Sequence, residues 1–391
     1  MKFKVANRIM SVLGKGTAVE WARNLAKGRK NLIRMETAEP NFAPPAHIIE
    51  AAKQAVEKAK FPYTDFQGLI ELREAVADYL EDMEPGLRYD PYSEILITSG
   101  AAEAIYITIQ GIVNPGDEII LFDPTYLAFE PCIMLAGGII KRVPLIEESG
   151  WTLDLETLSE KVGPKTKAII INSPNNPTGT VFNKVEIEQI AEIACREDII
   201  VVFDMVFDKI IYDDAKLENI AALPGMKNRT ILIGGFSKTY SMCGLRVGWL
   251  AGNAEIISAL TNTLHLYVSI CVSNVAQEAA LAALRGPQDW LKEWIRDYQE
   301  RRDILVQNLN SIPGIKCQLP KGGFFVFPNI SAIEKDSYKF AQDLVENTGI
   351  VVTPGLDYGP SGEGHVRMAF GAVSKAEVEE CVKRLKAYLR G

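Results

Sequence analysis

Short apolar runs alternate with segments of helical spacing along most of the chain. The runs are rich in β-branched residues and free of polar interruption, which is typical of parallel strands buried on both faces. Six such runs occur, at residues 95–98, 119–122, 168–171, 199–203, 230–233 and 247–251. Helical patterns such as Lys184 to Arg196 lie between them. The alternation predicts an α/β fold with a mostly parallel sheet wrapped by helices.

A smaller α/β unit is predicted beyond this sheet. The segment from Trp290 to Leu309 repeats apolar residues at helical spacing among charges, as a long bridging helix does. Three further strands are expected after it, at residues 323–327, 350–353 and 366–370. Ser374 and Glu377 have the spacing of a capping box, which predicts the start of the last helix.

Length and charge narrow the possible classes of protein. The chain has 391 residues, enough for two domains. Its net charge of -8 argues against a nucleic-acid surface, which needs clustered Lys and Arg. The six cysteines and three histidines are scattered, so neither a disulfide framework nor a metal site is expected. We find no apolar leader and no run of membrane-span length, and we expect a cytoplasmic protein that does not contact membranes.

One lysine stands in a segment suited to covalent chemistry. Lys238 lies between Ser237 and Thr239, with Arg246 eight positions later. A lysine becomes a nucleophile toward an aldehyde when burial or a neighbouring cation lowers its pKa. Arg246 is such a cation, and its guanidinium also binds an anion with two hydrogen bonds. Taken alone, the segment fits a solvated loop better than a reactive site.

An acidic residue closes one of the predicted buried strands. Asp204 directly follows the apolar run 199–203. A carboxylate there is costly to desolvate unless a cation, such as a protonated pyridine nitrogen, meets it. The carboxyl ends of strands are also where ligands bind in open α/β sheets. An aspartate that caps the next helix is the alternative.

Two further loops follow predicted strands. Residues 172–179 read Asn-Ser-Pro-Asn-Asn-Pro-Thr-Gly, in which the prolines and glycine fix the backbone so that an Asn amide points steadily at an acceptor. Residues 98–104 pass through small side chains into a helix, whose first N–H groups form a phosphate cradle. A plain Pro/Asn turn and an ordinary Ser N-cap are the simpler alternatives.

These motifs, in this order, resemble those of the class I/II aminotransferases, the fold-type-I family of pyridoxal 5'-phosphate (PLP) enzymes. The resemblance spans nearly the whole chain, from Glu39-Pro40-Asn41-Phe42 to Val366-Arg367-Met368-Ala369-Phe370. It implies a large domain at residues 45–285 with a mostly parallel seven-stranded sheet. The N-terminal residues 1–44 and the C-terminal residues 286–391 would form a smaller α/β domain. It also implies a homodimer with shared active sites.

The resemblance assigns cofactor roles residue by residue. Lys238 is implied to be the catalytic residue and to hold PLP as an internal aldimine, while Asp204 keeps the pyridinium protonated. Asn176 is similar to the residue that hydrogen-bonds the ring oxygen, and Tyr126 to the aromatic residue that stacks on the ring. The residues implied at the phosphate are Gly100, Ala101, Ala102, Ser237, Arg246 and, from the second subunit, Tyr63.

The resemblance also implies a substrate site and a reaction. Arg367 resembles the guanidinium that pairs with the substrate α-carboxylate, with Ala38 and Asn176 also at the substrate. The implied reaction moves the amino group of an L-amino acid to a 2-oxo acid by a ping-pong mechanism. No unassigned arginine stands out for a second carboxylate. The largely apolar stretch 265–271 is a candidate lining of the partner subunit's pocket, which favours neutral or aromatic amino acids; an ordinary helix face has the same pattern.

Two other functions stay open on the sequence. One is a PLP-dependent lyase of the same fold, because Lys238 and Asp204 serve both reactions. The other is a non-catalytic ligand-sensing module. A Rossmann dehydrogenase is disfavoured, because no G-x-G-x-x-G follows the first predicted strand.

Two positions depart from the family pattern. Phe207 stands where relatives have a tyrosine whose hydroxyl helps to hold the ring oxygen as a phenolate. We hypothesise that Asn176 does this alone and that the pKa of the internal aldimine is raised. Ala38 stands where relatives often have glycine, and its methyl group either narrows the pocket or has no effect.

Overall fold

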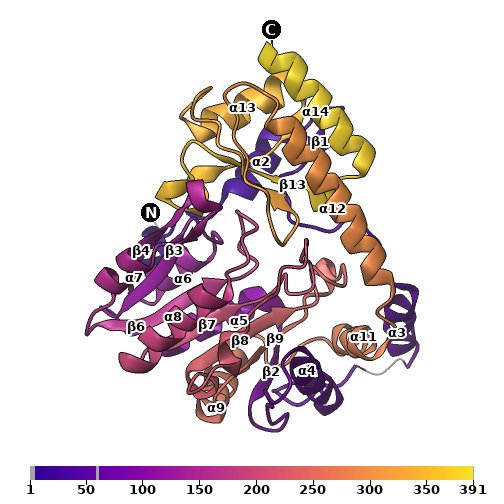
Figure 1. The fold of residues 1–391 in the computed structure, drawn as a ribbon. Coiled ribbons are helices and arrows are strands. Elements are labelled where there is room, and N and C mark those ends of the chain that lie inside the picture. The colour runs from indigo at the N-terminus through magenta and orange to yellow at the C-terminus, as the bar shows by residue number, and fades with distance from the viewer. Residues whose placement is uncertain (1–4, 59–60, 391) are drawn as a thin grey trace.

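The computed structural model describes residues 5–58 and 61–390 of the chain. A large sheet with helices on both faces forms the lower part of the molecule, and a smaller α/β unit lies above it (Figure 1). Helix α12 (Trp290–Leu309) runs from one unit to the other, which confirms the predicted bridging helix. Within the described residues, no helix is long and apolar enough to cross a membrane, and no cluster of His, Cys, Asp and Glu is arranged to hold a metal ion.

The large sheet has eight strands, and the six predicted apolar runs all lie in it. The strands in spatial order are β2 (Ile95–Thr98), β9 (Gly248–Ala251), β8 (Thr230–Gly235), β7 (Ile200–Asp204), β6 (Thr166–Asn172), β3 (Glu118–Asp123), β4 (Ile139–Ile146) and β5 (Thr152–Leu153). Strands β8 to β4 pair in parallel, whereas β9 and β5 are antiparallel to their neighbours. The mostly parallel sheet is confirmed, and the two-residue β5 adds an eighth strand at its edge.

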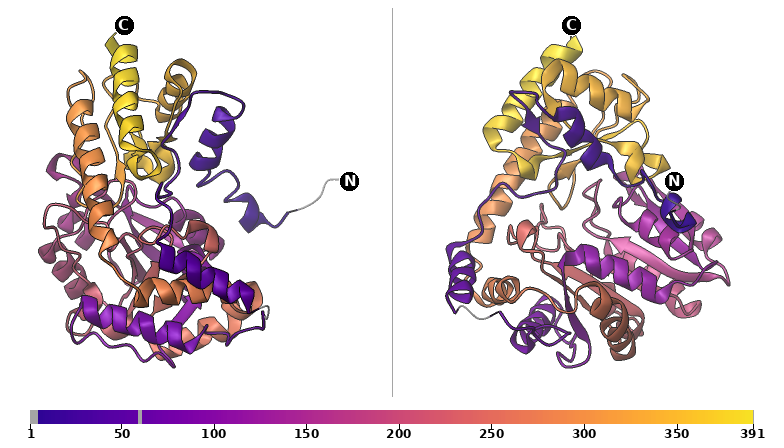
Figure 2. Two further views of the ribbon diagram at one scale, coloured as in Figure 1. Left: turned by 90° about the vertical axis from the view of Figure 1, so that its right-hand side faces the viewer. Right: turned by 180° about the vertical axis from the view of Figure 1, so that it is seen from behind.

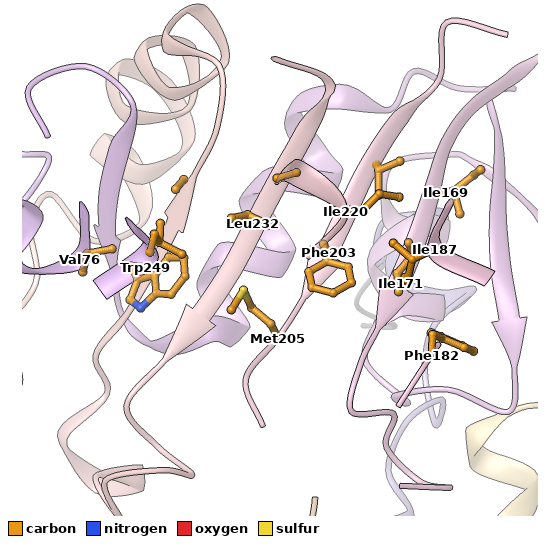
Figure 3. Packing of buried hydrophobic residues seen from close by; sticks show 14 of the residues in the cluster. Val76, Ile169, Ile171, Phe182, Ile187, Phe203, Met205, Ile220, Leu232 and Trp249 are labelled. Atoms are coloured by element: carbon orange, nitrogen blue, oxygen red, sulfur yellow. The ribbon is translucent and has the colours of Figure 1, made fainter. Parts of the chain in front are cut away.

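Both faces of the central strands are buried, which explains their uninterrupted apolar sequence. Successive residues of β6 alternate, so that Ile169 and Ile171 join the hydrophobic cluster on one face and Ile170 joins the cluster on the other. On the first face, Phe203 of β7 and Trp249 of β9 extend the same layer (Figure 3). Burial of each large apolar side chain contributes roughly 1.5–3 kcal/mol to stability.

Two sets of helices cover the sheet. The first face carries α3 (Ala46–Glu57), α4 (Ile70–Met83), α7 (Leu155–Lys161), α8 (Lys184–Arg196) and α11 (Asn274–Arg285). The second face carries α5 (Gly100–Ile112), α6 (Phe129–Leu135) and α9 (Ala254–Leu260). Helix α8 coincides with the predicted one and begins at a capping box of Asn183 and Glu186.

The smaller unit has its own hydrophobic cluster and two short sheets. The strands are β10 (Phe325–Val326), β13 (Val366–Ala369) and β12 (Thr353–Pro354) in one antiparallel sheet, and β1 (Ile33–Arg34) with β11 (Ile350–Val351) in a parallel pair. Helices α13 (Ser337–Thr348) and α14 (Lys375–Arg390) pack beside α12 and these strands. The predicted capping box is confirmed, because Ser374 N–H donates to Glu377 Oε2 at 2.7 Å and Glu377 N–H donates to Ser374 Oγ at 3.3 Å.

The N-terminal segment packs on the smaller unit. Strand β1 pairs with β11, and helix α2 (Ala18–Ala26) contacts α13. Figure 2 shows this segment crossing the outside of the molecule, with the short α1 (Asn7–Met10) near the N-terminus. The domain boundaries 1–44, 45–285 and 286–391 stay a prediction, and residues 1–4, 59–60 and 391 within them lie outside the described residues.

Candidate active site

Polar side chains gather where the parallel strands of the large sheet end. Asp204 is the last residue of β7, and the loops after β3, β6 and β8 carry Tyr126, Asn176 and Lys238. Arg367 reaches the same place from β13 of the smaller unit. Because the carboxyl ends of parallel strands share one edge of a sheet, residues far apart in the sequence meet there. Together they line a cavity of about 230 Å³.

The cavity brings together almost all of the predicted site residues. Those on its wall are Ala38, Ala101, Ala102, Tyr126, Asn176, Asp204, Ser237, Lys238, Arg246 and Arg367. Gly100 adjoins it at the start of α5. Tyr63 does not line the cavity and is 79% exposed, so its predicted role in a partner's site stays a prediction.

The surroundings of Lys238 lower the pKa of its amine. Its Nζ donates a hydrogen bond to the carbonyl oxygen of Ala38 at 2.5 Å. Burial lowers the pKa of Lys238, and the charges of Arg367 and Arg246 lower it further, although Cys243, 4.0 Å from Nζ, opposes them. A lowered pKa leaves more of the amine unprotonated near neutral pH, which a nucleophile or general base requires.

Asp204 is a buried carboxyl group that forms no salt bridge with any described residue. It is 3% exposed, and burial raises its pKa to about 7, although the N–H of Val206 donates to Oδ1 at 3.1 Å and Lys238 supplies some positive charge. A protonated ring nitrogen would provide the missing charge inside the cavity. The environment of Asp204 therefore fits the pyridinium nitrogen of PLP.

Arg367 is a buried guanidinium with spare hydrogen-bonding capacity. It donates from Nη1 to Asn176 Oδ1 at 3.1 Å and from Nη2 to the carbonyl oxygen of Glu36 at 2.6 Å, and it is 1% exposed. Among the described residues, its Nε has no hydrogen-bond partner. A guanidinium held by neutral acceptors in a cavity is ready to pair with an incoming carboxylate.

Small residues form one corner of the cavity at the start of α5. Gly100 has φ +77°, and a Cβ atom there would lie 2.6 Å from Arg246 Nη2, so only glycine allows the guanidinium this close to the turn. Gly248 of β9 has a similar role, because its added Cβ would lie 2.7 Å from the backbone nitrogen of Ala101. Helix N–H groups beside a guanidinium form an anion site, and this corner fits the PLP phosphate.

Aromatic side chains lie on the other walls. Burial raises the pKa of Tyr126 to about 12, so its phenol stays protonated near neutral pH. Phe207 is 4% exposed and packs edge-to-face on Phe324 and Phe325, with ring centroids 5.2 and 5.1 Å away. The cavity wall at Phe207 is therefore apolar.

Sequence reasoning missed several residues of the cavity wall. These are Val19, Ile105, Leu127, Asn172 and Val206. Asn172 accepts a hydrogen bond from the N–H of Asn176 at 2.7 Å and so holds the loop in place. Its position in the Asn-Pro motif was a signal for this role, whereas Val19 on α2 comes from a distant helix and carries no local signal.

A larger groove of about 690 Å³ lies between α4, α11 and α12. Tyr79, Lys209, Arg285 and other mixed side chains line it, and none of the predicted site residues does. The groove also contains lysine, carboxylate and arginine side chains, but the predicted site residues converge in the smaller cavity, so that cavity is the candidate site.

Comparison with known proteins gives a consistent result. The family profile for aminotransferase class I and II matches residues 30–385. An aspartate aminotransferase of Pyrococcus abyssi is 37% identical over 94% of both chains, and aromatic-amino-acid aminotransferase 2 of Thermococcus litoralis is 36% identical over the same shares. The solved structure of an alanine aminotransferase from Pyrococcus furiosus superposes with a TM-score of 0.92 at 30% identity, covering 99% of this chain and all of that one.

Proposed function

The chain belongs to the class I and II aminotransferases, and on that premise we propose that it binds PLP at Lys238 and uses neutral or aromatic L-amino acids as amino donors. Amino-group transfer to a 2-oxo acid is the activity of this family of fold-type-I enzymes. The observation that carries the proposal is that Lys238 and Asp204 line the same cavity. Burial lowers the pKa of the Lys238 amine and raises the pKa of the Asp204 carboxyl group.

The side chains of the cavity have separate proposed roles in the reaction. PLP, when bound, supplies a protonated ring that draws electrons from the substrate Cα. Asp204 would accept a hydrogen bond from the protonated ring nitrogen, and Arg367 would orient the substrate through its α-carboxylate. Lys238 Nζ would take the proton from the substrate Cα as a general base and deliver it, as a general acid, to the cofactor carbon that receives the amino group. Val19 and Leu127 line the same cavity with apolar side chains.

The charge on the cavity wall supports neutral or aromatic donors. Among the described lining residues the cations are Lys238, Arg246 and Arg367, and each has a proposed partner. A second substrate carboxylate would be desolvated without a cation from the same chain, which is costly. Apolar side chains such as Val19, Leu127 and Phe207 offer favourable contacts to an apolar side chain instead.

A panel of amino acids tests this preference. The PLP-loaded enzyme is mixed with phenylalanine, tyrosine, leucine or aspartate without an acceptor, and the loss of visible cofactor absorbance is followed. We expect kcat/KM for the best apolar donor to exceed that for aspartate by at least about tenfold, because a buried unpaired charge costs more than 1.4 kcal/mol. A preference for aspartate would contradict the proposed donor class. Release of ammonia and a 2-oxo acid in repeated turnovers would indicate a lyase.

We also propose a homodimer with shared active sites. Tyr63, Tyr267 and Val268 are 79%, 85% and 57% exposed in the single chain, which is unusual for side chains of this size and favours burial against a second subunit. Tyr63 would then reach the phosphate corner of the partner, as the family resemblance implies.

Phe207 provides a test of how the cofactor's ring oxygen is held. Phe207→Tyr places a hydroxyl on the cavity wall, where it can donate a hydrogen bond to that oxygen and stabilise its anionic form. We expect the pH midpoint of the visible absorbance of the PLP-loaded protein to fall by roughly one unit. One added hydrogen bond to the anionic form contributes about 1.4 kcal/mol, which corresponds to one pKa unit. An unchanged midpoint, with thermal stability also unchanged, would show that the missing hydroxyl has no such effect.

A further inference from the structure

A buried hydrogen-bond network lies directly behind the phosphate corner. At its centre is Glu103 of α5, which is 8% exposed. Its Oε2 accepts a hydrogen bond from the backbone N–H of Ser99. Its Oε1 accepts from Ser269 Oγ at 2.7 Å and lies 2.9 Å from Nδ1 of His265. One carboxylate thus connects the turn before α5 to the segment 265–269, more than 160 residues away.

The carboxylate is ionised in this network. Burial alone would raise the pKa of Glu103, but the hydrogen bonds from His265 and Ser99 outweigh it and hold the pKa below its ordinary value. An ionised Glu103 requires a hydrogen on Nδ1 of His265, which is fully buried. His265 lies at the end of a π-helical turn, Thr261–His265, so a rare backbone form delivers the imidazole to this point.

Besides the carboxylate of Glu103, neutral groups also restrain this turn: Thr98 Oγ1 donates to the carbonyl oxygen of Gly100 at 3.0 Å, and Ser99 Oγ lies 3.4 Å from Ser269 Oγ. Ser99 occupies the N-cap position of α5, yet its side chain makes no capping hydrogen bond to the helix. The next residue, Gly100, has a positive φ, a backbone conformation that glycine adopts far more readily than other residues. Ala101 and Ala102, which follow, line the cavity at the proposed phosphate corner. A displacement of Ser99 would therefore also displace the N–H groups at the start of α5, where the phosphate is proposed to bind.

We propose that Glu103, braced by His265 and Ser269, is a positioning residue for the cofactor phosphate. It fixes the Ser99–Gly100 turn so that the N–H groups at the start of α5 and the guanidinium of Arg246 face one point. The proposal rests on the proposed function, because it concerns the same PLP site. It also ties that corner to the segment containing Tyr267 and Val268, whose exposed side chains are expected at the subunit interface.

The test compares two ligands that differ only in the phosphate. Dissociation constants of PLP and of pyridoxal are measured by absorbance titration of the apoprotein for the wild type and for Glu103→Ala. We expect Glu103→Ala to raise the constant for PLP by about tenfold or more, the usual effect of losing a charge-assisted hydrogen bond. The constant for pyridoxal should stay within about twofold, because ring and aldehyde contacts are intact. Ser269→Ala should act in the same direction with a smaller effect, and it serves if Glu103→Ala does not fold.

Glu186→Ala is the matched control. Glu186 is also a buried glutamate in the first turn of a helix, is 5% exposed, and accepts from the N–H groups of Asn183 and Leu153, but it does not line the cavity. This variant should change neither constant. If the ratio of the two dissociation constants is the same in Glu103→Ala as in the wild type, whether both constants stay the same or both rise equally, the positioning role is overturned. A wild-type protein that binds neither ligand would overturn the proposed function as well.

Discussion

Lys238→Ala is expected to reduce the transamination rate by on the order of 10⁴-fold or more, because the variant loses both the nucleophile and the general base. The amine is the sole lysine on the wall of the cavity within the described chain. The measurement is the single-turnover rate with the best amino donor of the panel, at saturating PLP. Since the side chain does not belong to the hydrophobic clusters, the variant should fold with near wild-type stability.

A second lysine variant controls for a general effect of lost charge. Lys209 lies in the neighbouring groove, with Nζ 4.7 Å from the centroid of the Tyr79 ring. Lys209→Ala should keep nearly wild-type activity. Added methylamine should restore part of the activity of Lys238→Ala, because a small amine fits the space left by the side chain and can carry the proton. Full activity of Lys238→Ala without an added amine would contradict the assignment.

Asp204→Asn is expected to have opposite effects on activity and on the stability of the apoprotein. The amide cannot hold the ring nitrogen protonated, so the transamination rate should fall by about 10³-fold, corresponding to roughly 4 kcal/mol. In the apoprotein, the pKa of Asp204 is raised from 3.8 to about 7. A raised folded-state pKa stabilises the fold below pH 3.8, and this stability is lost as the pH rises to 7.

The amide removes this penalty, so apo Asp204→Asn should be more stable than the wild type at pH 9. The gain at pH 9, relative to pH 4, should be up to about 4 kcal/mol, from a shift of about three pKa units. Urea unfolding of both apoproteins at the two pH values measures it. Asp123→Asn is a matched control, because Asp123 is a buried carboxylate at the end of β3 that accepts from Ser361 and does not line the cavity. A rate loss as large in Asp123→Asn, or no pH-dependent gain in Asp204→Asn, would contradict the role given to Asp204.

The central sheet could be predicted because burial on both faces leaves an unbroken apolar sequence in each strand. Strand β4 lacked this signal, because it is near the edge of the sheet and includes Lys141, Arg142 and Pro144. The two-residue β5 is too short to show any periodicity. Where tertiary position rather than local pattern decides a strand, the sequence alone does not reveal it.

The residues of the candidate site also fall into those that the sequence predicts and those that it does not. Lys238, Asp204 and Asn176 each lie in a motif directly after a predicted strand, so topology placed them together. Val19 and Leu127 reach the cavity only through the packing of separate elements, which no local pattern records. The sequence indicates no catalytic or positioning role for His265, because its partner Glu103 is 162 positions away and only the folded chain brings the two side chains within 2.9 Å.

Borohydride reduction of the PLP-loaded protein, followed by proteolysis and mass spectrometry, tests the central claim most directly. Reduction makes the bond between the cofactor and its lysine permanent, so the modified peptide identifies the residue. The account predicts one modified site, Lys238, with about one cofactor per chain. Modification at another lysine, or a protein that acquires no cofactor mass at all, would contradict it.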